Sequence, residues 1–271
     1  IGKETVDAFI QAVSEQALCD AGMKKDISIV YTPLNGAGGY CVKRVLKENG
    51  FQNVFVVKEQ EMPDGCFPTC PYPNPEIEQA MELGIRDAKR LNCDLLLATD
   101  PDCDRVGVGV KSGCEYLLLS ANEIGMLLLE YICKRRSASG SMPCRPLMMK
   151  TIVTIDMAER IASEYGVDTV NVLTGFKYIG EQIGLLEEKG EEERFIFGFE
   201  ESYGYLSGSY VRDKDGVGAS LLICEMAAYY KNQGKGLKEV LDELYAKYGY
   251  CLNTLHCYTF EGLEGIRKMD G

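Results

Sequence analysis

The chain has 271 residues, of which 46% are hydrophobic and 26% charged, with a formal net charge of −12. This composition is typical of a globular protein and excludes a mainly disordered one. An acidic surface argues against a nucleic-acid partner, which needs a basic stripe. No apolar run reaches the roughly 20 residues of a membrane span, so no membrane partner is expected.

The cysteines and the chain ends bear on compartment and completeness. The twelve cysteines include no C-x-x-C pair, and the single histidine, His256, follows no zinc-finger spacing and is expected to be structural. Scattered cysteines behind an N-terminus without an apolar signal region favour free thiols in a reducing cytoplasm. The chain opens at Ile1 rather than Met and ends at Gly271 without a convincing final element. We therefore expect an excised piece of a longer polypeptide.

Residues 1–118 are predicted to form one α/β domain. A glycine-rich turn over 32–39 connects a strand to a helix and then to another strand, so neighbouring strands are expected to be parallel. The segment 61–75 holds five prolines, at 63, 68, 71, 73 and 75, and is predicted to be a loop. Apolar spacing predicts helices over 4–18, 40–47 and 75–91, and strands over 27–31, 53–57, 93–98 and 106–111.

Residues 119–271 are predicted to form a second, similar α/β domain. Ser120 and Glu123 have the spacing of a helix start. The same periodicity predicts helices over 120–135, 158–165, 178–186, 217–232 and 237–248, and strands over 147–155, 167–172 and 195–199. Each domain is therefore expected to hold a mixed, mostly parallel sheet flanked by helices.

The segment Asp100-Pro101-Asp102-Cys103-Asp104-Arg105 carries the strongest chemical signal. Three carboxylates at alternate positions after a buried strand can converge on one side of the chain. Oxygen ligands favour Mg²⁺ or Ca²⁺. An EF-hand loop needs Gly and Glu where Arg105 and Lys111 stand, which leaves an open Mg²⁺ site or a solvated acidic turn. Arg105 is suited to bidentate contact with phosphate.

Three further segments combine polar side chains with glycine. Glu200 and Ser202, two apart after a predicted strand, can bind vicinal sugar hydroxyls, although a polar turn explains them equally well. The strand-to-helix turn over 173–180 can offer backbone donors to an anion. Arg212 and Lys214 add positive charge, although a solvated charge run is the alternative. The turn over 32–39 lacks the P-loop ending and the dinucleotide spacing and is interpreted as structural.

Taken in order, these segments resemble the α-D-phosphohexomutase superfamily, in particular bacterial phosphoglucomutase/phosphomannomutase proteins. The resemblance covers essentially the whole chain. It rests on Thr32-Pro33-Leu34-x-Gly36-x-Gly38, Asp100-Pro101-Asp102-x-Asp104-Arg105, Thr174-Gly175-Phe176-Lys177-Tyr178-Ile179, Gly198-Phe199-Glu200-Glu201-Ser202-Tyr203-Gly204 and Arg212-Asp213-Lys214-Asp215-Gly216. Members have four domains, and this chain resembles the second and third.

The resemblance implies a role for each matching residue. It implies catalytic roles for Arg105, beside the transferred phosphate, for Lys214, near the reacting phosphate, and for Lys150. The implied metal ligands, for Mg²⁺, are Asp100, Asp102 and Asp104. The implied substrate-binding residues are Thr174, Gly175, Lys177, Glu200, Ser202 and Arg212, with Glu200 and Ser202 on the ring hydroxyls of a sugar phosphate.

The sequence departs from the family pattern in two ways. Asn35 stands where His is common. The sequence also holds neither a Ser-His-Asn-Pro phosphoserine segment nor an Arg-x-Ser-Gly-Thr phosphate loop, which belong to the first and fourth domains. The family reaction passes a phosphoryl group from phosphoserine to the sugar through a bisphosphate such as glucose 1,6-bisphosphate. This chain is therefore expected to supply metal and sugar recognition without catalysing alone.

Other functions stay open at this stage. A phosphopentomutase of the same superfamily would share these motifs, and the preference among glucose, mannose, glucosamine and pentose phosphates is not fixed. A non-enzymatic metal-binding module would need only the acidic loop. A nucleotide-binding dehydrogenase is disfavoured because the dinucleotide fingerprint is missing.

Overall fold

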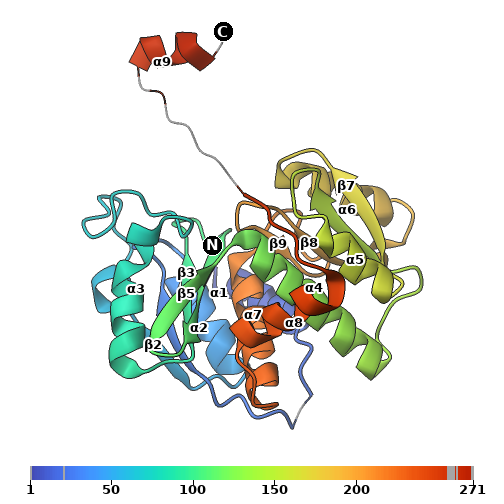
Figure 1. Ribbon diagram of the computed structural model, residues 1–271, viewed down its shortest axis with the longest axis horizontal. Coiled ribbons are helices and arrows are strands. Elements are labelled where there is room, and N and C mark those ends of the chain that lie inside the picture. The colour runs from blue at the N-terminus through green and yellow to red at the C-terminus, as the bar shows by residue number, and fades with distance from the viewer. Residues whose placement is uncertain (1, 21, 255–259, 261, 270–271) are drawn as a thin grey trace.

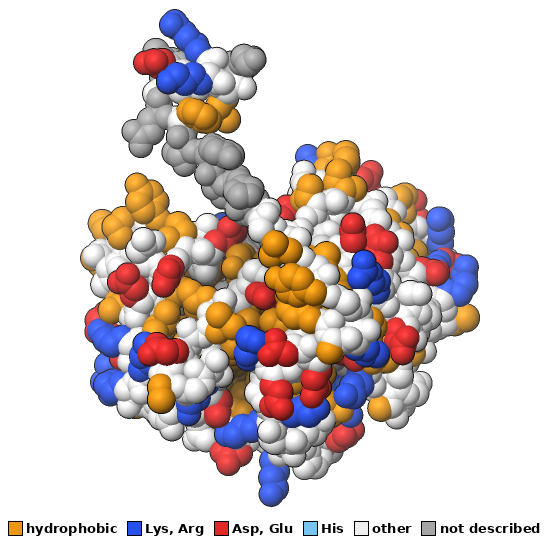
Figure 2. All heavy atoms as spheres, viewed as in Figure 1, with side chains coloured by type: hydrophobic (Ala, Val, Ile, Leu, Met, Phe, Trp, Pro, Cys, Tyr) orange, Lys and Arg blue, Asp and Glu red, His pale blue; other side chains and the backbone are white. Residues whose placement is uncertain are grey.

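The computed structural model consists of two α/β units placed side by side (Figure 1). It describes residues 2–20, 22–254, 260 and 262–269, so His256 lies outside the described residues. None of the described helices combines the length and apolar character needed to cross a membrane. Acidic and basic side chains are interspersed on the face shown in Figure 2, so the negative charge is not concentrated in one patch on that face.

The first unit is built on a five-stranded sheet with the order β2-β1-β3-β4-β5. The strands β1, β2 and β3 are parallel, as predicted, whereas β4 and β5 run antiparallel to their neighbours. The prediction missed β5. The strands are β1 (Ser28–Thr32), β2 (Asn53–Val56), β3 (Leu95–Thr99), β4 (Val106–Ser112) and β5 (Glu115–Leu119).

Helices cover both faces of this sheet because side chains alternate between the faces along each strand. Val30 and Leu96 point to the face covered by α3, whereas Ile29 and Leu97 belong to the large core on the other face. That second face is covered by α1, α2 and α7. The helices of this unit are α1 (Lys3–Ser14), α2 (Gly39–Glu48) and α3 (Glu78–Leu91), with a short 3-10 helix, η1 (Lys58–Gln60).

The second unit has a four-stranded sheet with the order β7-β6-β8-β9, parallel except for β9. The prediction missed β9 and made β6 too long, because the chain turns where Thr154 N donates to Thr151 O (3.1 Å). Its elements are β6 (Leu147–Thr151), β7 (Asp168–Val172), β8 (Phe195–Phe199), β9 (Tyr205–Leu206), α4 (Ala121–Ser139), α5 (Met157–Glu164), α6 (Phe176–Glu187) and η2 (Glu192–Arg194).

The predicted start of α4 is confirmed, because Ser120 and Glu123 form a capping box.

Two later helices contact both units and join them. The helix α7 (Gly216–Lys231) contacts α2, β3 and β4 of the first unit and α4 and β9 of the second, and α8 (Leu237–Tyr248) contacts β4 and α4. Both lie between the sheets in Figure 1. The expectation of no final element is wrong, since α9 (Gly262–Met269) follows.

Candidate functional site

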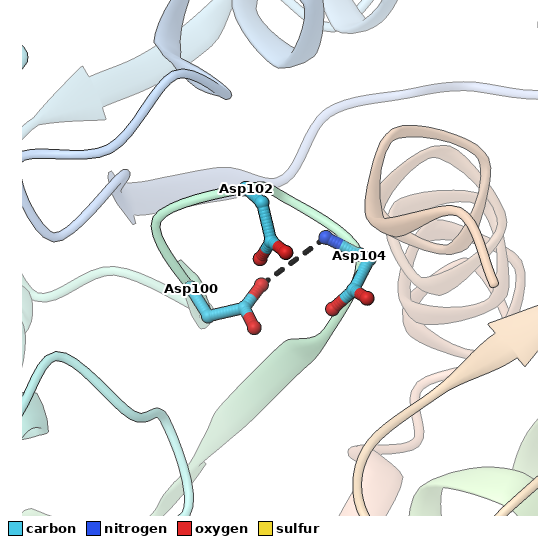
Figure 3. A group of neighbouring side chains, drawn as sticks. All are labelled: Asp100, Asp102 and Asp104. Carbon is cyan, nitrogen blue, oxygen red and sulfur yellow. Dashed lines mark hydrogen bonds between the residues drawn. The ribbon is translucent and has the colours of Figure 1, made fainter. Parts of the chain in front are cut away.

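The loop after β3, residues 100–105, is organised by the side chain of Asp100. Its Oδ1 accepts the backbone N–H groups of Asp104 (3.1 Å) and Arg105 (3.0 Å), and its Oδ2 accepts Arg105 Nε (2.7 Å). Asp100 is buried, at 1% exposure. These bonds curl the chain around one carboxylate, so Asp102 and Asp104 project toward it (Figure 3).

The three carboxylates converge, as their spacing predicts. One oxygen from each of Asp100, Asp102 and Asp104 lies within 4.8 Å of the other two. Burial raises the pKa of Asp100 to about 6, against the lowering effect of the Arg105 N–H, and the charge of Asp104 adds to the rise. Within the described residues, Asp104 Oδ1 is buried without a hydrogen-bond partner, although Arg105 Nε lies 3.6 Å away. An oxygen-only donor set with one orphaned acceptor fits a hard metal ion.

The glycine-rich turn after β1 braces the aspartate loop. A Cβ on Gly36 would collide with the main chain of Pro101, and one on Gly38 would collide with the Cys103 side chain. Ala37 N donates to Pro101 O (2.8 Å). The two loops therefore fit together because these positions carry no side chain, in accord with the structural interpretation of this turn.

Asn35 holds the proline-rich segment in place. Its side chain is buried and donates to Met62 O (2.9 Å), while Thr69 Oγ1 donates to its Oδ1 (3.3 Å). The segment that it anchors exposes Met62 and Tyr72, at 72% and 75%. Figure 2 shows hydrophobic side chains gathered at the corner where this segment lies. The residue that departs from the family pattern thus has a structural role here.

The loop after β8, residues 200–204, meets the aspartate loop edge to edge. Arg105 and Gly204 form an antiparallel bridge, and Val106 N donates to Tyr203 O (3.1 Å). Glu200 is buried, at 4% exposure. Burial raises the pKa of Glu200, while the nearby Lys214 and the Ser202 hydroxyl act in the opposite direction. The structure therefore brings Glu200 and Ser202 beside the aspartates.

Lys214 lies between these two loops. Its Nζ is 2.8 Å from Asp104 Oδ2, 3.5 Å from Asp213 Oδ1 and 3.9 Å from Glu200 Oε1. Burial opposes protonation of Lys214, but the hydrogen bond and charge of Asp104 outweigh it and raise its pKa. The lysine is placed by the start of α7, where Gly216 N donates to Cys103 O (3.0 Å).

A cavity of about 380 Å³ opens beside this cluster. Its wall includes Asp102, Asp104, Asp213 and Lys214 together with Phe9 of α1. Arg105 borders the cluster, with Nη1 3.6 Å from Glu76 Oε1 and about a third of its side chain exposed. Acidic and basic side chains thus face one another around a space of small-molecule size.

The remaining predicted residues lie on the turn into α6 and on the loop before α7. Thr174 and Lys177 are exposed and Gly175 is half-buried, at the turn between β7 and α6. Arg212 donates to Ser209 O (2.6 Å) and pairs with Glu187 at the end of α6. These residues border α6 rather than the aspartate loop.

Lys150 is directed into the turn after β6. It is 1% exposed, and its Nζ is 3.0 Å from both Thr154 O and Asp156 Oδ1 and 3.5 Å from Glu159 Oε1. The structure does not bring this ammonium to the aspartates.

Sequence reasoning gave no role to Glu201 or Glu76. Glu201 Oε2 accepts the hydroxyls of Thr151 (2.6 Å) and Thr154 (3.2 Å), which ties the loop after β8 to the end of β6. Glu76 faces Arg105 from the end of the proline-rich segment. Glu201 lies in one of the motifs identified in the sequence, but no sequence spacing indicates that its partners, Thr151 and Thr154, lie some fifty residues earlier in the chain.

Comparisons with known proteins bear on the family of the chain. Models of the phosphoglucomutase/phosphomannomutase family match the chain, α/β/α domain II over residues 7–113 and α/β/α domain III over residues 120–248. A phosphoglucomutase of Staphylococcus aureus (strain MRSA252) is 36% identical over 248 residues, which make up 91% of this chain and 44% of that protein. The chain therefore spans less than half the length of the curated relatives it matches.

Solved structures share the fold. A phosphoglucomutase/phosphomannomutase family protein from Burkholderia thailandensis superposes with a TM-score of 0.67 and 18% identity, covering 89% of this chain and 46% of that one. The phosphoglucomutase pp63/parafusin from Paramecium, in its open form, gives a TM-score of 0.64 and 15% identity, covering 91% and 42%.

Proposed function

The chain belongs to the phosphoglucomutase/phosphomannomutase family, and we propose that it is the metal- and sugar-binding part of an α-D-phosphohexomutase. Such an enzyme interconverts a hexose 1-phosphate and a hexose 6-phosphate. The observation that carries the proposal is the junction of the aspartate loop and the Glu200 loop, bridged at Arg105 and Gly204 and spanned by Lys214. The proposed metal ligands and Glu200 would thereby share one wall of the site.

Asp100, Asp102 and Asp104 would hold Mg²⁺. The ion would neutralise charge on the phosphoryl group during transfer. Two observations support this assignment: the donor set is oxygen-only, and Asp104 Oδ1 has no hydrogen-bond partner in the described part of the chain. Because bonds within the loop already orient Asp100, these carboxylates would be positioned before an ion binds, which suits electrostatic catalysis.

The sugar phosphate would bind across the junction. Glu200 would accept hydrogen bonds from ring hydroxyls and Ser202 would donate or accept one. Arg105 and Lys214 would hold the phosphate that is transferred. Thr174, Gly175, Lys177 and Arg212 would line a more distant part of the same site, near α6.

Lys150 takes an indirect place in this proposal. Its contacts with Thr154 and Asp156 support a role in shaping the turn that holds Glu201, rather than contact with phosphate.

The phosphoryl donor would come from outside this chain. In the family the phosphoserine belongs to the first domain, and no Ser-His-Asn-Pro segment stands in this sequence. The partners we propose are therefore a sugar phosphate and the first and fourth domains of one polypeptide, with glucose 1,6-bisphosphate as intermediate. A cytoplasmic location fits the free thiols of the described cysteines.

Calorimetric titration of Mg²⁺ tests the proposal. Asp102→Asn is expected to weaken Mg²⁺ binding by about 100-fold, because one of three ligands loses its charge. Glucose 1,6-bisphosphate is expected to strengthen binding to the wild type. Asp26→Asn, in the segment before β1, is the control: it removes the same charge and should leave the Mg²⁺ affinity unchanged.

The other outcomes separate the alternatives. Mg²⁺ binding that ignores sugar phosphates, with a strong preference for Ca²⁺, would favour a non-enzymatic metal-binding module. A response to ribose 1-phosphate but not to hexose phosphates would favour a phosphopentomutase. No metal binding by the folded chain would contradict the proposal.

A further inference from the structure

Lys214 is held where it touches both halves of the site at once. Its side chain crosses Gly204 of the Glu200 loop so closely that a Cβ there would collide with Lys214 Cδ. Its ammonium then reaches Asp104 Oδ2 at 2.8 Å while remaining 3.9 Å from Glu200 Oε1. The side chain is 17% exposed, so water screens these charges incompletely.

The Lys214 ammonium binds an oxygen of Asp104, one of the proposed metal ligands. Asp104 offers two oxygens: Oδ1 has no hydrogen-bond partner within the described residues, and Oδ2 is bound by Lys214. Asp213 and Glu200 also face the lysine, and Arg105 is the other cation beside the aspartates. A positive charge on Asp104 reduces the attraction of the three aspartates for a divalent ion.

We propose that Lys214 is a shared cation that couples the two halves of the site. While its ammonium is bound to Asp104, Lys214 weakens Mg²⁺ binding. When the phosphate of a sugar phosphate draws the ammonium away, Mg²⁺ binding becomes tighter. The inference rests on the proposed function and goes beyond it by assigning the coupling to one ion pair. Because coupling between two ligands is reciprocal, Mg²⁺ would raise the affinity for the sugar phosphate by the same factor.

This coupling gives Lys214 effects of opposite sign on its two ligands. A lysine that merely stabilised the loop would weaken both when removed. Removal of the shared cation instead strengthens binding of Mg²⁺ alone and weakens binding of the anionic sugar. That difference in sign separates a coupling role from a structural one.

The test compares Lys214→Gln with Lys214→Arg and with Lys238→Gln. Lys238 of α8 forms a 2.6 Å pair with Asp242 on an exposed surface, so its loss changes the net charge equally without touching the site. Calorimetry is run with Mg²⁺ alone and with Mg²⁺ at saturating glucose 1-phosphate. Lys214→Gln is expected to bind Mg²⁺ alone about tenfold more tightly, as the loss of one incompletely screened charge predicts.

In the wild type, glucose 1-phosphate is expected to tighten Mg²⁺ binding, and in Lys214→Gln most of this gain should vanish. Lys214→Arg keeps the charge and should behave like the wild type, as should Lys238→Gln. Unchanged or weaker binding of Mg²⁺ by Lys214→Gln would overturn this inference and leave the proposed function standing. Absence of Mg²⁺ binding by the wild type would instead refute the proposed function, and the two failures are therefore distinguishable.

Discussion

The loop after β3 and the loop after β8 both follow buried strands, yet they are held in different ways. The first curls around its own Asp100, which accepts three hydrogen bonds from Asp104 and Arg105, and the glycine-rich turn braces it from outside. In the second, the Glu201 side chain is bound by two distant residues, Thr151 and Thr154. The carboxylates of the metal half are thus oriented mainly by bonds within one loop, whereas the sugar half depends more on contacts between elements.

The largest expected effect comes from loosening the brace of the first loop. Gly36→Ala would place a Cβ against the Pro101 main chain, which cannot yield without moving the aspartates. We expect a loss of about 3 kcal/mol in the free energy of unfolding, measured by urea denaturation, together with weaker Mg²⁺ binding.

Gly65→Ala is the matched control, because nothing lies within 4 Å of a Cβ at Gly65. It should change stability by no more than about 0.5 kcal/mol. Equal stabilities for the two variants would mean that the glycine turn does not brace the aspartate loop.

A smaller effect is expected from freeing the second loop. Glu201→Ala removes the acceptor of the Thr151 and Thr154 hydroxyls and should cost about 2 kcal/mol of stability. It should also weaken binding of glucose 1-phosphate, while binding of Mg²⁺ alone stays close to the wild-type value.

A double-mutant cycle with Thr151→Val sharpens this prediction. If the contact is what holds the loop, the two substitutions together should cost less than the sum of their separate effects. Strict additivity would show that the contact between Glu201 and Thr151 does not hold the loop. An equal loss of Mg²⁺ affinity would show that the two loops are not held independently.

The smallest expected effect follows from the proton on Asp100. Its folded-state pKa of about 6 lies above the ordinary 3.8, so the metal-free folded chain holds this proton more tightly than the unfolded chain does. The contribution of Asp100 to stability therefore falls as pH rises from about 4 to about 6. Mg²⁺ competes with the same proton, so its affinity should rise about tenfold between pH 5 and pH 7.

Calorimetric titrations at pH 5, 6, 7 and 8 measure that rise, which should level off above pH 7. An affinity that is constant from pH 5 to pH 7 would show that Asp100 is not protonated in this range or does not bind the ion.

The same contrast explains what the sequence could predict. The strand β8 and the helix α8 match their predicted bounds to the residue, because a wholly apolar strand and an amphipathic helix are visible in the local sequence pattern. β5, which is as long as β8 but only partly buried, and the two-residue β9 were missed because their form depends on pairing with neighbouring strands.

The same distinction between local and long-range contacts applies to the candidate site. Convergence of the aspartates could be predicted, since the chain turns around its own Asp100. The contact between Glu201 and Thr151 could not, because it arises when β6 pairs with β8.

The position of α7 has a consequence for how the chain folds. This helix is buried nearly all round and covers one face of the five-stranded sheet, although it follows both sheets in sequence. A nascent chain that had formed the first sheet with α1 and α2 would therefore leave the part of that face under α7 exposed to water until α7 was made. The large core therefore contains residues of both family segments, and we expect the two segments to unfold together rather than one at a time.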